Sequence, residues 1–295
     1  MRTVRLVVPV PPGGIVDFVG RVLGQKLSEV TGQNVVVDNR PGASTIVGTE
    51  LVARSLGDGY TLLANTLPLV VNPSLFPKLQ FDVEKDLAPV SLVVTAPYLM
   101  VVHPSVPVRS IKELIALAKA RPGVVKYSSG GNGTNLHVAA ELFKNLTHTD
   151  IVHVPYRGGG PALTGVVAGE ADLSVLALVA VLPQVNAGRL RALAITSRQR
   201  SPVVAQLPTV AEAGVPGFEF TSWVGVLVPA TTPPRLIATL NDYIVKAMRS
   251  PGVTERFSGE GAEVVAGTPA QFGAQIKTEI ARWAKVVREN QLKAD

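Results

Sequence analysis

The 295-residue chain contains no cysteine, which excludes disulfide bonds, thiolate metal sites and a cysteine nucleophile. Aromatic residues make up only 5% of it, too few for a surface on which nucleic-acid bases stack. Long hydrophobic runs are also missing. The longest, residues 173–182, contains Ser174, stops at Pro183 and is shorter than the roughly 18 residues of a membrane-spanning helix. We interpret this run as a buried strand followed by a turn of helix.

A concentrated patch of positive charge is missing as well. The formal net charge is +6, but the lysines and arginines are dispersed along the chain without a cluster of four or more. A nucleic-acid-binding surface normally gathers its basic residues on one face. We therefore expect no nucleic-acid partner, and the charge favours attraction to anionic solutes or surfaces.

The first residues do not have the pattern of an export signal. Residues 4–10 are apolar but too short for the hydrophobic region of a signal peptide, and Pro9, Pro11 and Pro12 interrupt the segment. We expect no signal peptide within this chain and predict the first strand of a mature domain here.

Strand and helix patterns alternate from the start, and the length is sufficient for two hydrophobic cores. Such alternation predicts an α/β fold in which parallel strands are covered by helices. Residues 110–113 form a capping box for a helix through Lys119, and Thr268 with Pro269 begins the last helix. Strands are predicted at residues 4–10, 35–37, 60–64, 125–129, 151–156, 172–178, 191–196 and 223–228.

The order of these elements predicts two lobes, each a parallel-rich sheet flanked by helices. We expect residues 1–100 and 222–295 to form a discontinuous first domain, and residues 101–221 to form an inserted second domain. Two interdomain crossings are expected, near residues 99–102 and 220–224.

The first candidate binding segment is the glycine-rich loop containing Gly13, Gly14 and Ile15, which joins the first strand to the first helix. Ligands of parallel sheets collect at such carboxyl ends of strands, and the free amides of a first helical turn attract anions. Asp17 is expected near the third helical position, where it supports the helix end. An ordinary tight turn with a capping aspartate is the alternative interpretation.

The second candidate segment, residues 128–135, also follows a strand. Ser129, Asn132 and Thr134 offer hydroxyl and amide groups, and Gly131 and Gly133 allow the backbone to approach a ligand. Either Thr134 or Asn135 is expected to cap the following helix. The glycine spacing resembles a dinucleotide fingerprint, but the acidic residue expected about 20 residues further on is missing. We therefore predict an anion site and no bound cofactor.

The histidines favour neither a metal site nor a hydrolase. His148 and His153 are poorly spaced for metal ligands, and no tight His/Asp/Glu cluster accompanies them. Ser129, His137 and Asp172 could be combined into a serine triad, but no Gly-x-Ser-x-Gly elbow is present. We expect no metal and no catalytic residue.

An ordered set of short motifs covers nearly the whole chain, and together they resemble the solute receptors of tripartite tricarboxylate transporters, the Bug family. The matching segments are residues 11–14 with Asp17, 38–43, 58–63, 72–75, 153–158, 190–194, 208–214 and 216–219 followed by Trp223. One departure is Ser44-Thr45, where the family usually has more glycine.

The resemblance implies a periplasmic, two-domain clamshell that binds a mono- or dicarboxylate in its cleft. It also implies that backbone amides and ordered waters bind the carboxylate, from the loops matching residues 13–15 and 129–134. As partners, we expect a membrane permease or a sensor, and the receptor itself is expected to be a monomer.

Two further segments are candidates for the distal end of the ligand, residues 66–69 with Thr66 and residues 175–179 with Ala177. Both are mainly apolar, which favours an aliphatic or aromatic acid.

Two alternatives to the receptor remain: an enzyme of deaminase or dehydratase type on a similar two-lobed fold, and the effector module of a transcription regulator. An enzyme needs convergent titratable groups, which these loops lack, and a regulator needs a helix-turn-helix, which the sequence lacks.

Overall fold

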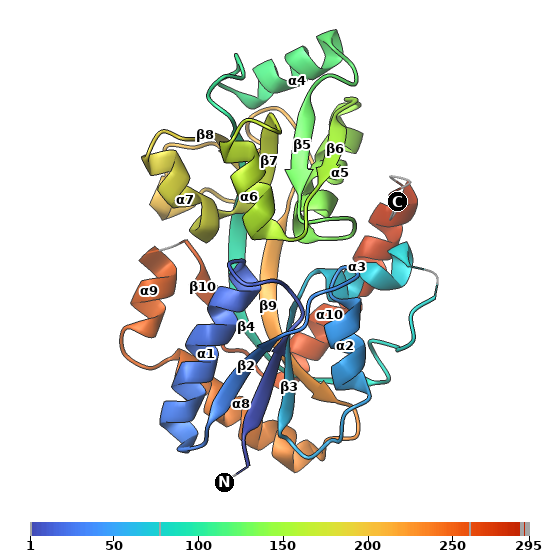
Figure 1. Ribbon diagram of the computed structural model, residues 1–295, viewed down its shortest axis with the longest axis vertical. Helices are drawn as coiled ribbons and strands as arrows, with labels where there is room; N and C mark the ends of the chain where they lie inside the picture. The colour runs from blue at the N-terminus through green and yellow to red at the C-terminus, as the bar shows by residue number, and fades with distance from the viewer. Residues whose placement is uncertain (1, 77, 260, 290–291, 293–295) are drawn as a thin grey trace. The chain divides into compact units, whose positions relative to one another are not determined.

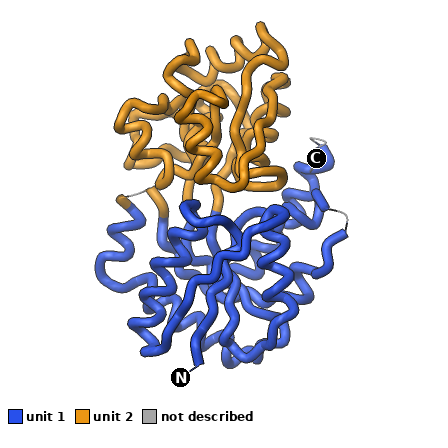
Figure 2. Tube along the Cα trace, viewed as in Figure 1, with its two compact units in different colours: residues 1–95, 223–258, 263–294 blue, residues 96–222, 259–262, 295 orange. Residues whose placement is uncertain are grey.

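The structure is a computed structural model that describes residues 2–76, 78–259, 261–289 and 292 (Figure 1). The predicted domain limits at residues 1 and 295 lie outside the described residues. The chain divides into two compact units (Figure 2). Unit 1 comprises Met1–Thr95, Trp223–Ser258 and Glu263–Ala294, and unit 2 contains Ala96–Ser222 and Gly259–Ala262.

In unit 1, β1 pairs in parallel with both β2 and β3, and β3 pairs antiparallel with β9. The elements are β1 (Val4–Val8), α1 (Ile15–Thr31), β2 (Val35–Asn39), α2 (Ile46–Ala53), β3 (Thr61–Thr66), α3 (Pro68–Leu75), β9 (Thr221–Pro229), α8 (Pro234–Met248), α9 (Val253–Gly259), β10 (Glu263–Val264) and α10 (Pro269–Glu289), with the ends of β9 and α9 reaching unit 2.

In unit 2, β5 pairs in parallel with both β6 and β7. The elements are α4 (Ile111–Ala120), β5 (Lys126–Ser129), α5 (Asn135–Thr147), β6 (Val152–Pro155), α6 (Gly159–Val167), β7 (Leu173–Ala177), α7 (Leu178–Asn186), β8 (Arg191–Ile195) and the 3-10 turn η1 (Pro202–Val204). The capping box is confirmed, because Ser110 Oγ accepts a hydrogen bond from Glu113 N at 3.2 Å.

The longest strand, β4 (Leu87–Val102), contributes to both units. Its first part pairs antiparallel with β10, and its second part pairs antiparallel with β7 and β8. The order of neighbouring strands is β2-β1-β3-β9-β4-β7-β5-β6, and β4 takes part in the pairings of both units. The α/β fold class is confirmed. The pairing is mixed, because β9 runs antiparallel to β3, and β4 runs antiparallel to β7, β8 and β10.

The core of unit 1 depends on close contact between α1 and β1. Leu6, Val7 and Val8 are fully buried, and a Cβ at Gly20 would lie only 2.8 Å from Val8 Cγ2. Glycine at this position therefore lets the helix lie directly on the strand. Among the described residues, no helix combines the length and the apolar character that crossing a bilayer requires.

Candidate functional site

The turn between β5 and α5 gives unit 2 its candidate binding loop. Gly131 and Gly133 have φ values of 106° and 74°, a region that side chains with a Cβ rarely occupy. Thr134 is the N-cap of α5, and the first helical hydrogen bond runs from Val138 N to Thr134 O. The N–H groups of residues 135–137 therefore have no acceptor within the helix, and they carry the positive end of its dipole.

Hydrogen bonds within the loop fix its shape. Gly131 N donates to Ser129 Oγ at 3.0 Å, and Gly133 N donates to His137 Nδ1 at 3.2 Å. The Thr134 hydroxyl donates to Gly131 O at 2.7 Å rather than capping the helix. The amides of Gly131 and Gly133 therefore shape the loop. The binding role of residues 129–134 stays a prediction.

Two imidazoles lie together behind this loop. His153 Nε2 is 2.5 Å from Ser129 Oγ, and the ring of His153 lies 4.7 Å from that of His137 and stacks on Tyr127. Ser129, which the sequence alone could combine with His137 in a serine triad, therefore contacts His153. Asp172, the third member of that combination, accepts a hydrogen bond from Lys126 N at 2.7 Å instead.

Asn135 anchors the beginning of α5. Its Nδ2 donates to Tyr98 Oη at 2.8 Å and to Ser222 Oγ at 2.7 Å, and all three side chains are buried. Burial raises the pKa of Tyr98, and the hydrogen bonds to Asn135 and Ser222 only partly oppose that rise. The phenol therefore stays neutral, and it fixes the first residue of the helix from β4.

The candidate loop of unit 1 uses a similar arrangement. Gly14 is the N-cap of α1, and the first helical bond runs from Phe18 N to Gly14 O, so the N–H groups of residues 15–17 have no acceptor within the helix. Gly13, with a φ of 95°, donates its amide to Asp17 Oδ2 at 3.1 Å. Asp17 thus lies in the first turn of α1, as expected. Its carboxylate also accepts the hydrogen bond of the Gly13 amide.

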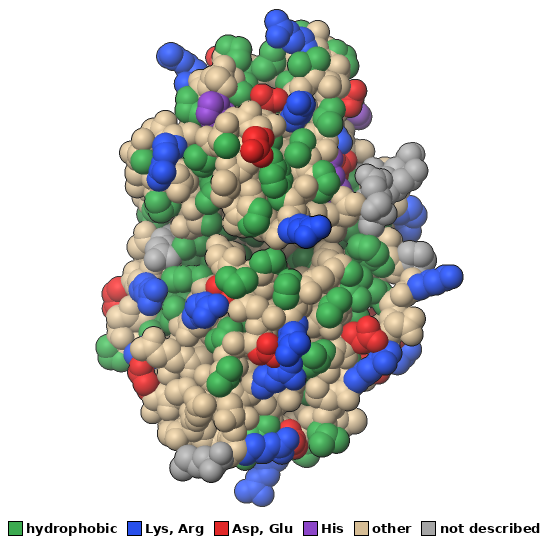
Figure 3. Space-filling model, in the orientation of Figure 1, with side chains coloured by type: hydrophobic (Ala, Val, Ile, Leu, Met, Phe, Trp, Pro, Cys, Tyr) green, Lys and Arg blue, Asp and Glu red, His purple; other side chains and the backbone are tan. Residues whose placement is uncertain are grey.

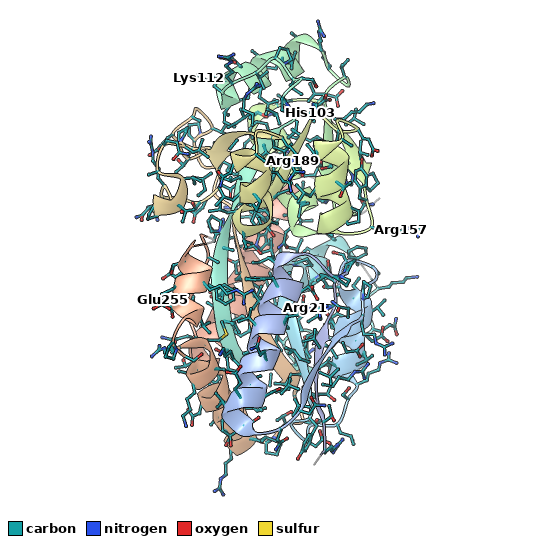
Figure 4. All side chains as sticks on the ribbon, turned by 60° about the vertical axis from the view of Figure 1, so that its left-hand side comes forward. Arg21, His103, Lys112, Arg157, Arg189 and Glu255 are labelled. Atoms are coloured by element: carbon teal, nitrogen blue, oxygen red, sulfur yellow. The ribbon has the colours of Figure 1, made fainter. Side chains whose placement is uncertain are left out.

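Asp17 is an ionised side chain with only 4% of its surface exposed. Arg21, which lies on the same helix (Figure 4), forms an ion pair with it at 3.0 Å, and Asn39 Nδ2 donates to Oδ1 at 2.9 Å. Burial alone raises the pKa of Asp17, but the hydrogen bonds from Arg21, Asn39 and Gly13 outweigh burial and lower it. The carboxylate is therefore charged and fully used, and it is not available as a catalytic base.

A buried polar network continues from the end of β3. Thr66 N donates to Asn65 Oδ1, Asn65 Nδ2 donates to Thr49 Oγ1, and the Thr49 hydroxyl donates to Thr45 O. Asn72 Nδ2 then donates to the carbonyl of Ser44 at 2.7 Å. Sequence reasoning placed Thr66 at the distal end of a ligand and did not identify the network beneath it.

The loop before α2 is strained, because Ala43, Ser44 and Thr45 all have positive φ values. Among the described residues, no partner is found for Ser44 Oγ, Thr45 Oγ1 or the buried Oδ1 of Asn72. Ser44-Thr45 is also the segment that departs from the family pattern. Strain and unused polar atoms thus occur together in this loop, next to the network that leads to Thr66.

The remaining predicted residues lie at the same sheet edges as the loops. Thr66 ends β3, which is parallel to β1, and Ala177 ends β7, which is parallel to β5. Carboxyl ends of parallel strands meet at one edge, so Thr66 shares an edge with Gly13 in unit 1. In the same way Ala177 shares an edge with Ser129 in unit 2. Both Thr66 and Ala177 are at least nine-tenths buried.

Lys and Arg side chains are scattered over the visible face and do not form one patch (Figure 3). Within the described ranges, no group of three or more His, Asp or Glu side chains is arranged to hold a metal ion. The donors that the two loops offer are thus mainly backbone N–H groups at helix ends.

Comparison with known proteins gives the family. The sequence model described as the tripartite tricarboxylate transporter family receptor matches residues 19–292. The chain belongs to this receptor family. The receptor is 42% identical to the protein BugT of Bordetella pertussis over 290 residues, which are 98% of this chain and 89% of BugT. The resemblance seen in the sequence motifs is therefore confirmed.

Solved structures agree with the family match. The receptor has a TM-score of 0.95 and 36% identity to R. palustris Rpa4515 with adipate, covering 99% of this chain and 98% of that one. For MatC from Rhodopseudomonas palustris with bound malate, the values are 0.93 and 31%, with coverages of 97% and 99%. The periplasmic binding protein BugD gives 0.94 and 29%, with coverages of 99% and 98%. The receptor thus shares the fold of solute-binding proteins.

Proposed function

We propose that the receptor binds a small mono- or dicarboxylate, aliphatic or aromatic, and that its loops at residues 13–15 and 129–134 contribute to the binding. One observation carries the proposal: α1 and α5 each begin at a glycine-containing loop with three N–H groups that have no acceptor inside the helix. Such groups stabilise an anion without a basic side chain. Adipate and malate, which are bound to two related proteins, are small dicarboxylates.

The ligand is proposed to leave the receptor chemically unchanged. Ser129 and His153 form the only pairing in these loops that suggests a nucleophile, among the residues that the structure describes. However, Ser129 is fully buried, and its Oγ already accepts the amide of Gly131. A hydrolytic serine must be exposed to its substrate. The pair therefore supports the loop better than it supports catalysis.

The cellular role is proposed from the family. The family description names a transporter receptor, and one structural neighbour is a periplasmic binding protein. We propose that this receptor is periplasmic as well, that its two compact units act as its two domains, and that it passes its ligand to a membrane permease or a sensor. If deletion of the gene abolishes uptake of the radiolabelled ligand, delivery to a permease is supported. Unchanged uptake would contradict delivery to a permease.

A thermal-shift screen with mono-, di- and tricarboxylates, including adipate and malate, tests the binding function. A ligand at about 100 times its Kd adds about 2.7 kcal/mol to the free energy of unfolding. We expect at least one carboxylate to stabilise the receptor, and mass spectrometry should recover that acid unchanged after long incubation. Absence of any stabilising carboxylate would contradict the function, and a stoichiometric product would indicate an enzyme.

A further inference from the structure

The loop of unit 2 depends on an ionisable side chain. His137 is 3% exposed and is the third residue of α5, and its Nδ1 accepts the hydrogen bond from Gly133 N at 3.2 Å. A nitrogen that accepts a hydrogen bond carries no hydrogen. The geometry therefore requires the neutral imidazole with its hydrogen on Nε2.

Protonation would remove this contact. A protonated His137 would direct N–H toward the N–H of Gly133, so the hydrogen bond would be lost. Its charge would also lie at the positive end of the α5 dipole, where a cation is destabilised. Gly133 immediately precedes the N-cap Thr134, so a change at Gly133 alters the point at which the helix begins.

The ionisable groups near His137 lie on α5 itself and on the strands packed against it. From β6, the ring of His153 lies 4.7 Å away, and from β5 Tyr127 stacks on His153. On α5 itself, Glu141 is shared between Tyr127 Oη at 2.6 Å and Lys144 Nζ at 2.7 Å. The packed strand β7 carries no ionisable side chain, and Lys126 of β5 is exposed.

We propose that His137 is the positioning residue of the carboxylate-binding loop, and that this loop keeps its binding conformation only while the imidazole is neutral. The expected consequence is weaker ligand binding as the pH falls, and this consequence rests on the proposed function. His153 has a supporting role, because its contact with Ser129 Oγ fixes the atom that accepts the amide of Gly131.

The first test needs no ligand. NMR of the ¹⁵N-labelled full chain should show His137 Nδ1 without a hydrogen at about pH 8, and the Gly133 amide resonance should follow the titration of the His137 ring between about pH 8 and 5. A hydrogen on Nδ1 at the higher pH would overturn the proposal even if carboxylates bind. A Gly133 resonance that does not change while the His137 ring is protonated would overturn it as well.

The second test uses adipate and three variants. Wild-type Kd should rise by up to about tenfold for each pH unit below the pKa of the imidazole. In His137→Leu, Kd should be about tenfold higher already at about pH 8, because the acceptor is lost. His137→Asn places an amide oxygen near the position of Nδ1, so it should recover most of the affinity and lose the pH dependence.

His148→Asn is the matched control. His148 is exposed at the other end of α5 with a φ of 51°, a conformation that asparagine tolerates well. Its pH profile should equal that of the wild type. A pH dependence that survives in His137→Asn, or affinity that stays constant or increases as the wild type is acidified, would contradict the proposal. If adipate does not bind at all, the proposed ligand is in doubt, and the NMR test decides the role of His137 by itself.

Discussion

The backbone N–H of Gly133 donates a 3.2 Å hydrogen bond to Nδ1 of His137, the third residue of helix α5. In the other unit Gly13 donates in the same way to Asp17, the third residue of α1, at 3.1 Å. Both side chains thus reach back to the glycine before the N-cap, a variant of the capping box. The two loops share a design but differ in charge, since one acceptor is a carboxylate and the other a neutral imidazole.

Asp17 is predicted to make the stability of the receptor depend on acid. Folding lowers its pKa, so its contribution is present above the unfolded value of about 3.9 and is lost as the pH falls through the lower folded value. Asp17→Asn should lower the free energy of unfolding by about 1–2 kcal/mol at neutral pH and should remove this acid dependence. Urea denaturation at several pH values measures both effects, and an unchanged pH profile would contradict the assignment.

Gly14 tests the loop of unit 1 with little risk to the fold. Its φ is −94°, and a Cβ added there would meet no atom within 4 Å. The backbone at this position therefore accepts a side chain. Gly14→Ala and Gly14→Leu should fold with wild-type melting temperatures, whereas the leucine should raise the ligand Kd by about tenfold or more by covering the N–H groups. Unchanged affinity in a folded Gly14→Leu would remove this loop from the site.

Thr134 is expected to act through the loop rather than as a helix cap. Its hydroxyl donates to Gly131 O, so Thr134→Val should weaken ligand binding by about 1–2 kcal/mol and Thr134→Ser should retain it. Thr278→Val is the control, because Thr278 makes a similar bond to Ala274 O on the exposed side of α10. Calorimetric titration compares the four proteins. Equal affinity of the Val and Ser variants would show that the hydroxyl is not needed.

Asn135 is expected to matter for stability. Asn135→Ala removes the donor that Tyr98 and Ser222 share and leaves their buried oxygens with fewer hydrogen bonds. The melting curve should shift by the equivalent of about 2–3 kcal/mol. A shift within the error of the wild type would mean that the anchor of α5 lies elsewhere.

Much of the fold could be predicted from the sequence because the strand and helix patterns differ in period. The strands β5 to β9, the helix α4 and the beginning of α10 were predicted near their observed bounds. Strand β4 was not predicted, because it is largely buried and carries no alternating pattern, although a crossing was expected near its end at residues 99–102. Helix α3 was missed because Pro73 lies inside it and its apolar residues show no helical stripe.

The partners inside the candidate loops could not be predicted in the same way. The contact between Ser129 and His153 follows from the parallel register of β5 and β6, in which Tyr127 lies opposite His153. Register depends on packing across the sheet and leaves no local signal in the sequence. The pairing of Asp17 with Gly13 was closer to prediction, because an acidic residue at the third helical position is a local signal. The involvement of Thr66 and Ala177 in ligand binding stays a prediction.

The most direct test is a crystal structure of the receptor with the acid that stabilises it most in the screen. We expect a carboxylate oxygen within about 3.2 Å of an N–H group in residues 134–137 or 14–17, with no lysine or arginine beside it. The side chains of Asp17 and His137 should still accept the amides of Gly13 and Gly133. A carboxylate bound through a basic side chain, or at a site away from both loops, would contradict the account.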